Sequence, residues 1–124
     1  MAELTVTSDE KNGAVVLYPD GFINAHTVQA FEKAVQSLVE KQVYHIVINC
    51  NGLSYINSSG LGVLMGVIEE IQENKGFLLL SNMNETVFNI FDTLGFTHLF
   101  KVFDTEDEAI SAIKDQKNEE QTHE

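Results

Sequence analysis

Two adjacent serines, Ser58 and Ser59, are the side chains best placed in this sequence to carry chemistry. The run over 43–48 upstream of them is apolar, β-branched and too short for an ordinary helix, so it predicts a buried strand. Downstream, apolar residues recur at the three- and four-residue spacings of a helix packed on a core: Leu61, Leu64, Ile68 and Ile71. We therefore expect the serines at or just before a helix N-terminus.

A helix N-terminus is a favourable position for a negative group, because unpaired N–H groups and the positive end of the helix dipole meet there. A phosphate on one of the serines would suit this position. The same residue types also serve as helix caps, so the alternative is that Asn57 or Ser58 only caps the helix.

The elements around the serines alternate between strands and helices, with no internal repeat. Extended patterns over 4–8 and 14–18 flank Asn12-Gly13, a strong signal for a hairpin turn. The turn residues Pro19-Asp20-Gly21 are expected to end the second of these strands. Further strands are predicted over 43–49, 77–80 and 99–103.

Three more amphipathic helices are predicted besides the one that follows the serines. Their inward stripes are Val28, Phe31, Val35 and Leu38; Val87, Phe88, Phe91 and Leu94; and Ala109, Ile110 and Ile113. Asn84 is expected to cap the middle one of these helices. Thr105 with Glu108 three residues later is the capping-box signature of the last helix.

Strands separated by helices favour right-handed crossovers and a mostly parallel sheet, which the opening hairpin makes mixed. The predicted fold class is α/β, a single domain with a mixed, mostly parallel sheet, an N-terminal hairpin and about four α-helices. We place this domain at residues 1–116. Residues 117–124 are predicted to form an acidic, disordered tail.

Composition limits the classes of partner. Seven lysines, no arginine and nineteen acidic residues give a formal net charge of −12, which argues against binding to nucleic acid. No apolar run approaches the roughly 20 residues that cross a membrane, so direct membrane insertion is not expected. The start of the chain lacks a signal-peptide pattern, and the single cysteine, Cys50, is expected to be a packing residue. Both observations favour the cytoplasm.

Patterns typical of enzymes are weak throughout the sequence. The spacing of a nucleophile elbow is absent, because Asn57 stands where its first glycine would be. The glycine-rich run over 60–66 resembles a dinucleotide loop, but the acidic residue expected after the next strand is missing. No acidic partner of a triad lies near the histidines before the tail: His26, His45 and His98. We therefore expect no enzyme activity, no cofactor and no metal site.

The run Leu53-Ser54-Tyr55-Ile56-Asn57-Ser58-Ser59-Gly60-Leu61-Gly62-Val63-Leu64 resembles the signature of STAS domains. Within that family the run is most similar to that of the bacterial anti-sigma factor antagonists. The likeness covers most of the chain, residues 4–114, and includes Gly21-Phe22-Ile23-Asn24 and the run over 87–96.

This resemblance implies a partner-switching protein. Such proteins bind an anti-sigma factor that is also a serine kinase, and so free the sigma factor. The kinase uses ATP and magnesium to phosphorylate the first serine of the motif, here Ser58, and a phosphatase restores the active form. Ser59 is the less favoured acceptor. The partner-binding residues implied by the resemblance are Asn24, Asn57, Ser58, Ser59, Gly60 and Gly62.

Two positions depart from the usual pattern of the family. Asn57 and Asn24 stand where the family commonly has aspartate. An amide keeps the shape and the hydrogen bonding, but it cannot bind a cation as a carboxylate does. If these aspartates help the kinase reaction, phosphorylation here is slow or absent. The alternative function is therefore a non-phosphorylated STAS docking subunit of a signalling or membrane-transport complex.

Overall fold

The computed structural model describes residues 3–122, with side chains described up to residue 117. Its elements in chain order are β1 (Leu4–Lys11), β2 (Ala14–Ile23), α1 (Val28–Glu40), β3 (His45–Asn49), β4 (Leu53–Ile56), α2 (Ser58–Glu73), β5 (Phe77–Ser81), α3 (Glu85–Thr93), the 3-10 turn η1 (Phe96–His98), β6 (Val102–Phe103) and α4 (Glu106–Thr122). This order confirms the predicted α/β class.

The sheet is mixed, as predicted. Its strand order is β1-β2-β3-β5-β6, and β4 pairs with the far end of β2. Only the β1–β2 pair is antiparallel among the strands described, and the other pairs are parallel. The hairpin turn uses Asn12 and Gly13, both with positive φ (53° and 84°), which suits a tight turn between twisted strands.

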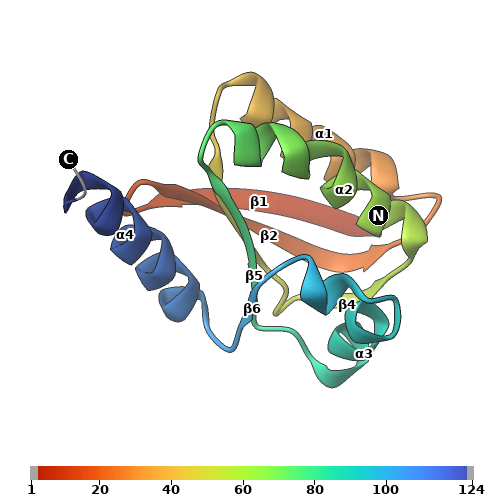
Figure 1. Cartoon of the computed structure of the whole chain (residues 1–124). Helices are drawn as coiled ribbons and strands as arrows, with labels where there is room; N and C mark the ends of the chain where they lie inside the picture. Colours follow the sequence, from red (N-terminus) through yellow and green to blue (C-terminus); the bar gives the residue numbers. More distant parts are fainter. Residues whose placement is uncertain (1–2, 123–124) are drawn as a thin grey trace.

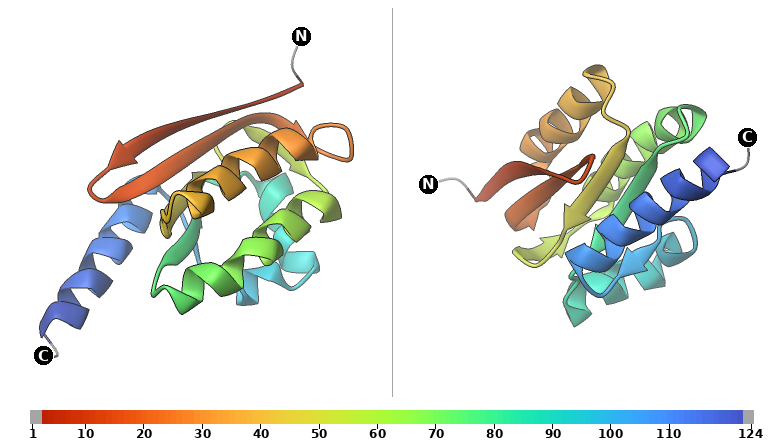
Figure 2. Two further views of the ribbon diagram at one scale, coloured as in Figure 1. Left: turned by 90° about the horizontal axis from the view of Figure 1, so that it is seen from above. Right: turned by 90° about the vertical axis from the view of Figure 1, so that its left-hand side faces the viewer.

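Helices cover both faces of the sheet. Figures 1 and 2 show α1 and α2 side by side over one face, α4 against the other, and α3 with η1 at the end near β4 and β6. Alternation along the strands explains this layering: Ile46 and Ile48 of β3 join the core beneath α1 and α2, whereas Val47 between them joins the smaller core beneath α4.

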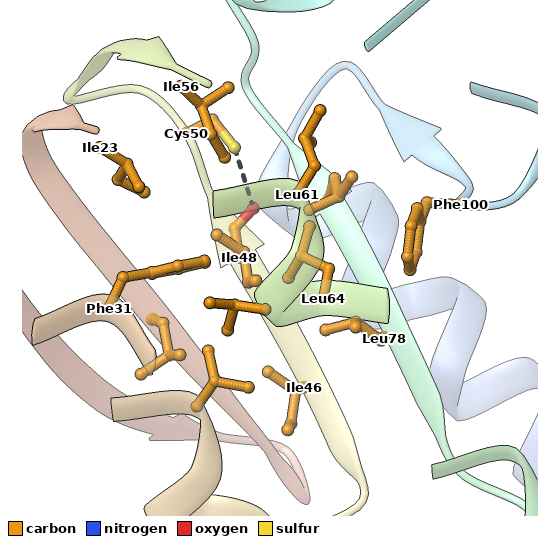
Figure 3. Close-up of a cluster of buried hydrophobic side chains, with 14 of the residues drawn as sticks. Ile23, Phe31, Ile46, Ile48, Cys50, Ile56, Leu61, Leu64, Leu78 and Phe100 are labelled. Carbon is orange, nitrogen blue, oxygen red and sulfur yellow. Dashed lines mark hydrogen bonds between the residues drawn. The ribbon is translucent and has the colours of Figure 1, made fainter. Parts of the chain in front are cut away.

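The larger core lies beneath α1 and beneath α2, the helix that begins at Ser58. Phe31 from α1 and both Leu61 and Leu64 from α2 are almost fully buried there (Figure 3). Cys50 lies in the same core as a buried free cysteine, so the prediction that it is a packing residue is confirmed. Burial raises the pKa of its thiol to about 12, which leaves it protonated and unreactive at neutral pH.

Two strand predictions were wrong. Strand β2 does not end at Pro19 but continues to Ile23. The proline is tolerated because β3 pairs with β2 only over Val15–Leu17 and β4 only over Gly21–Ile23, so its missing N–H interrupts neither ladder. The final strand is also shorter than 99–103, since Leu99 follows η1 and only Val102–Phe103 pairs with β5.

Helix α3 buries less than predicted. Val87 and Phe91 are buried, but Phe88 and Leu94 are 40% and 55% exposed. The helix has only nine residues and lies at the end of the sheet. Its two buried residues, Val87 and Phe91, are therefore one helical turn apart on the side that faces the core. None of the described helices combines the length and apolar character needed to span a membrane.

Helix α4 continues to Thr122, beyond the predicted domain boundary at residue 116. The predicted capping box is present in part: Thr105 Oγ1 accepts from Glu108 N (3.2 Å) and donates to Glu108 Oε1 (3.0 Å). The division into a domain over 1–116 and a tail over 117–124 stays a prediction, and residues 123–124 lie outside the described part of the chain.

Candidate functional site

Ser58 is the first residue of α2, and its side chain is exposed. The residue before it, Asn57, has extended backbone angles and caps the helix: Asn57 Oδ1 accepts from Ser59 N (3.0 Å) and Gly60 N (3.4 Å). Among the described residues, none forms a hydrogen bond with the Ser58 hydroxyl. The cap is therefore Asn57, and the Ser58 hydroxyl is available to another molecule.

The two serines are not equivalent. Ser59 is half-buried, and its hydroxyl donates a 2.5 Å hydrogen bond to Asn57 Oδ1. A phosphoryl group on Ser59 would break this bond and disturb the cap, whereas Ser58 can be modified without losing a contact. Of the two hydroxyls, that of Ser58 is therefore the more accessible.

Asn24 and Asn57 are 33 residues apart in the chain, but they follow directly after the neighbouring strands β2 and β4. Ile23 pairs with Ile56 at the carboxyl ends of the parallel strands β2 and β4, and Asn57 N donates to Ile23 O (3.1 Å). The two asparagines follow directly after this pair. The structure therefore brings together Asn24, Asn57 and Ser58 from two loops, at the sheet edge where ligand sites commonly form in open α/β folds.

Asn24 organises the start of α1 in the way that Asn57 organises the start of α2. Its Oδ1 accepts from His26 N (2.9 Å) and Thr27 N (3.2 Å), and Asn24 N donates to Thr27 Oγ1 (2.9 Å). An amide oxygen performs this acceptor role as a carboxylate would, but without charge. Neither α1 nor α2 has an acidic residue in its first turn. This edge of the molecule thus joins two positive helix ends without a neutralising carboxylate in either first turn.

The glycines of the motif differ in their surroundings. Gly60 is buried, and a Cβ at this position would lie 2.7 Å from side-chain atoms of both Ile23 and Ile56. Gly62 and Gly66 are exposed, and a Cβ at either would meet nothing within 4 Å. Gly60 therefore packs closely against β2 and β4. At Gly62 and Gly66, in contrast, the outer face of α2 is exposed and has no side chain.

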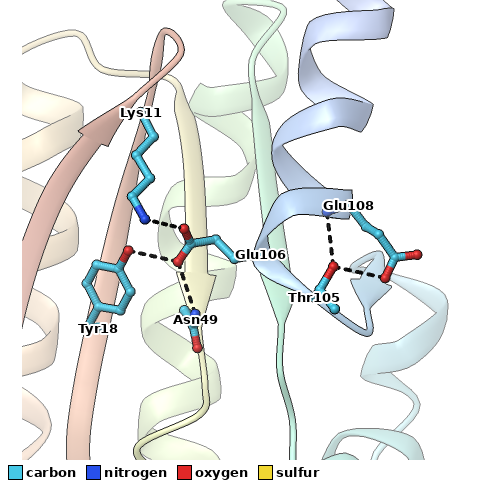
Figure 4. A network of polar contacts seen from close by, with 6 residues as sticks. All are labelled: Lys11, Tyr18, Asn49, Thr105, Glu106 and Glu108. Atoms are coloured by element: carbon cyan, nitrogen blue, oxygen red, sulfur yellow. Dashed lines mark hydrogen bonds and ion pairs between the residues drawn. The ribbon is translucent and has the colours of Figure 1, made fainter.

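A second polar cluster lies on the opposite face of the sheet and was not predicted. Glu106, at the start of α4, accepts hydrogen bonds from Lys11 (2.6 Å), Tyr18 (2.8 Å) and Asn49 (3.0 Å), as Figure 4 shows. Burial alone raises the pKa of Glu106, but these hydrogen bonds outweigh it and lower the pKa overall, while the same contact raises the pKa of Lys11. These groups satisfy one another, so the cluster fastens α4 to the sheet.

The part of the chain that the structure describes contains no group of three His, Cys, Asp or Glu that would hold a metal ion. His26 and His98 are exposed, and His45 is half-buried against Phe77 with ring centroids 5.6 Å apart. His26 and His98 therefore lie at the surface, and His45 lies partly beneath it.

Comparison with known proteins agrees with this geometry. The family model described as "STAS domain" matches residues 5–109. The chain is 23% identical to the anti-sigma F factor antagonist of Paenibacillus polymyxa over 112 residues, covering 90% of this chain and 96% of that one.

Solved structures of anti-sigma factor antagonists share the fold. An anti-sigma factor antagonist from Mycobacterium paratuberculosis superposes with a TM-score of 0.82 at 22% identity, covering 90% of this chain and 94% of that chain. The anti-sigma factor antagonist SpoIIAA in its unphosphorylated form has a TM-score of 0.75 at 25% identity, covering 89% and 96%. The fold, the serine-bearing helix start and the family match together place this chain in the STAS domain family.

Proposed function

We propose that this protein is a cytoplasmic anti-sigma factor antagonist that binds an anti-sigma factor with serine kinase activity, and that phosphorylation of Ser58 releases it from that partner. The observation that carries the proposal is the exposed Ser58 hydroxyl at the N-terminus of α2, whose first turn has no acidic side chain, in a chain of the STAS family. Relatives of this chain are named anti-sigma factor antagonists, and SpoIIAA is described in both an unphosphorylated and a phosphorylated form.

In this proposal the protein is the acceptor and not the catalyst. The γ-phosphoryl group of ATP passes to Ser58 Oγ, the bond to ADP breaks, and the serine proton passes to a base on the kinase. A phosphatase reverses the modification by hydrolysis. The contribution of this chain is to present the hydroxyl at the end of α2, held there by the Asn57 cap.

The energetics favour a switch in binding over a switch in folding. A phosphate adds about −1.5 to −2 charges at neutral pH. At the N-terminus of α2 it gains about 0.3–1 kcal/mol from the helix dipole, so the local structure is retained. In an interface against other buried groups, an unpaired charge costs about 2–5 kcal/mol, a loss of at least about thirtyfold in affinity.

The docking surface in this proposal is the outer face of α2 with the loop before α1. Gly62 and Gly66 let another backbone approach, and Ser58 and Asn24 lie at one end of this face. A net charge of −12 steers the protein towards a partner with a basic surface.

The test is to incubate the purified protein with the anti-sigma factor kinase encoded in the same genome, together with ATP and magnesium, and to measure intact mass. We expect one added phosphate, mapped to Ser58 by fragmentation. Ser58→Ala is expected to abolish the addition and to retain binding, and Ser59→Ala serves as the control that keeps the acceptor.

Phosphate on another residue, or no phosphate on the wild type while the kinase binds it, would remove the switch from the proposal. In that case the neutral Asn24 and Asn57 give the physical reason, because neither can help to hold a magnesium ion for the kinase. Stable binding without phosphorylation would favour the docking-subunit alternative.

A further inference from the structure

A groove runs between α1 and α2 on the same side of the molecule as Ser58. It has a volume of about 210 Å³ and is lined by Gln36, Val39, Glu40, Gly66, Val67 and Glu70. Gly66 lies eight residues after Ser58 on α2, which corresponds to about 12 Å along the helix axis. The groove is therefore separate from the acceptor serine, but within reach of one partner that covers both.

The bottom of the groove is apolar, and its mouth is open. Val39 and Val67 are 7% and 5% exposed and contribute to the larger core. The mouth is open because Gly66 has no side chain, and a Cβ there would meet nothing within 4 Å. An aliphatic chain entering at Gly66 would thus lie against two valines.

The rim of the groove is negative. Glu40 and Glu70 are exposed, and neither α1 nor α2 has a basic residue in its last turn. The two helices run side by side in the same direction (Figure 2), so their negative dipole ends lie on the same side as these carboxylates. Among the described residues only Lys11 and Glu106 form an ion pair, so Glu40 and Glu70 have no ion-pair partner there. Glu70 accepts one long hydrogen bond, from the Tyr44 hydroxyl at 3.4 Å.

We infer that this groove holds a lysine or arginine side chain of the anti-sigma factor kinase that docks over Ser58. The inference rests on the proposed function and adds a second contact point to it. The aliphatic part of the basic side chain packs on Val39 and Val67, and its cation lies between Glu40 and Glu70. Charge complementarity selects this occupant, because an apolar side chain would leave the two carboxylates unpaired.

The position of the groove has a consequence for the switch. At physiological ionic strength charges are screened over about 8 Å, and the groove lies about 12 Å from Ser58 along α2. Phosphorylation of Ser58 therefore leaves the groove contact in place. The weak binding that remains after phosphorylation should then depend on Glu40 and Glu70.

The experiment measures the affinity of that kinase for Glu40→Gln/Glu70→Gln and for a control, Asp9→Asn/Asp115→Asn. Both doubles change the net charge equally, keep the side-chain shape and replace exposed carboxylates, but the control residues do not line the groove. We expect about fivefold weaker binding for the groove variant, since two exposed ion pairs are lost, and a change below about twofold for the control.

A second variant tests the shape of the groove. Gly66→Leu fills the mouth, and it should fold because nothing lies within 4 Å of the added Cβ and leucine favours a helix more than glycine. We expect weaker kinase binding with a thermal midpoint that is unchanged or raised. Gly66→Ala is the matched control: it adds only the Cβ, which would meet nothing within 4 Å, and it separates filling of the mouth from the gain in helix propensity.

A probe independent of the kinase separates the groove from the proposed function. In ¹⁵N spectra, a hexa-arginine peptide should shift the amides of Val39, Gly66 and Val67, whereas hexa-citrulline should not. Equal kinase affinity for the wild type and the groove variants would overturn the inference and leave the proposed function standing. If no kinase binds the wild type, the proposed function fails, and the absence of arginine-specific shifts at these three amides would overturn the groove as well.

Discussion

The N-termini of α2 and α4 are built from the same sequence device, a polar cap before an amphipathic helix, and yet they carry opposite charge. Helix α4 has Glu106, Asp107 and Glu108 in its first turn, and Glu106 is held by three hydrogen bonds. Helix α2 has no acidic residue in its first turn, a neutral cap at Asn57 and an exposed Ser58.

The difference separates an end that anchors its helix from the end at which we propose phosphorylation. At α4 the positive end of the helix is already neutralised by the protein's own carboxylates, which fix the helix to the sheet. At α2 the same electrostatic position is left without a carboxylate, so a phosphate can occupy it without competition. The predictions that follow test this contrast, beginning with the largest expected effect on stability.

The tight packing at the start of α2 can be broken by one methyl group. Gly60→Ala is expected to lower the free energy of unfolding by about 1–3 kcal/mol, because the new Cβ would lie 2.7 Å from side-chain atoms of Ile23 and Ile56. Gly62→Ala is the matched control and should be neutral or stabilising by up to about 1 kcal/mol. Urea unfolding measures both, and equal effects would contradict the assigned packing.

The hydrogen bonds that Glu106 accepts at the start of α4 can be weakened without changing the shape of its side chain. Glu106→Gln removes the charge that Lys11 and Tyr18 share, and we expect a loss of about 0.5–1.5 kcal/mol in the free energy of unfolding. Asp107→Asn, exposed in the same turn, should change it far less. A loss of similar size in both variants would mean that the stabilisation comes from the helix dipole and not from the hydrogen bonds of Glu106.

The stabilisation by Glu106 is also expected to depend on pH. The pKa of Glu106 is lower in the folded protein than its ordinary value of 4.5, so the folded state binds fewer protons there. Its contribution is complete above pH 4.5 and disappears as the pH falls through the folded pKa. The difference in unfolding free energy between wild type and Glu106→Gln should therefore shrink in acid, and a difference independent of pH would contradict this assignment.

Substitutions at Asn57 can either weaken or strengthen the cap of α2. Asn57→Ala should destabilise the protein by about 1 kcal/mol, because Ser59 N and Gly60 N lose their acceptor. Asn57→Asp keeps the acceptor and adds the missing negative charge, so it should stabilise by about 0.3–1 kcal/mol in low salt. If the aspartate variant were less stable than wild type, the positive end of α2 would not be vacant.

The smallest expected effect belongs to Ser58 itself. Ser58→Asp should raise the free energy of unfolding by less than about 1 kcal/mol, because the carboxylate meets the positive helix end and displaces no contact. Ser111→Asp, exposed in the middle of α4, is the control without a nearby helix end. Marked destabilisation by Ser58→Asp alone would show that the modification acts on folding.

Local signals in the sequence predicted the local structure well. The hairpin at Asn12-Gly13, the caps Asn84 and Thr105 and the helix after Ser58 depend on residues close together in the chain. The position of Ser58 at a helix start followed from the switch between strand and helix periodicity alone. Those features are fixed by short-range hydrogen bonds and by which face is apolar.

Features that depend on distant contacts were missed. Strand β4 (Leu53–Ile56) has a buried–exposed–exposed–buried pattern without clean alternation, because it pairs with β2 alone. The Lys11–Glu106 pair joins residues 95 apart in the chain, and no spacing rule indicates it. The groove between α1 and α2 arises from the packing of two separate helices. The apolar pattern of neither helix alone therefore predicts which residues line it.

The central claim is that a charge on Ser58 changes binding and not folding. The most direct measurement is the affinity of the anti-sigma factor kinase for the unphosphorylated protein and for the protein phosphorylated on Ser58, with the thermal midpoint of each form. The account predicts an affinity loss of at least about thirtyfold and a thermal midpoint that is unchanged or slightly raised. Equal affinity for the two forms, or a phosphorylated form that melts at a clearly lower temperature, would contradict it.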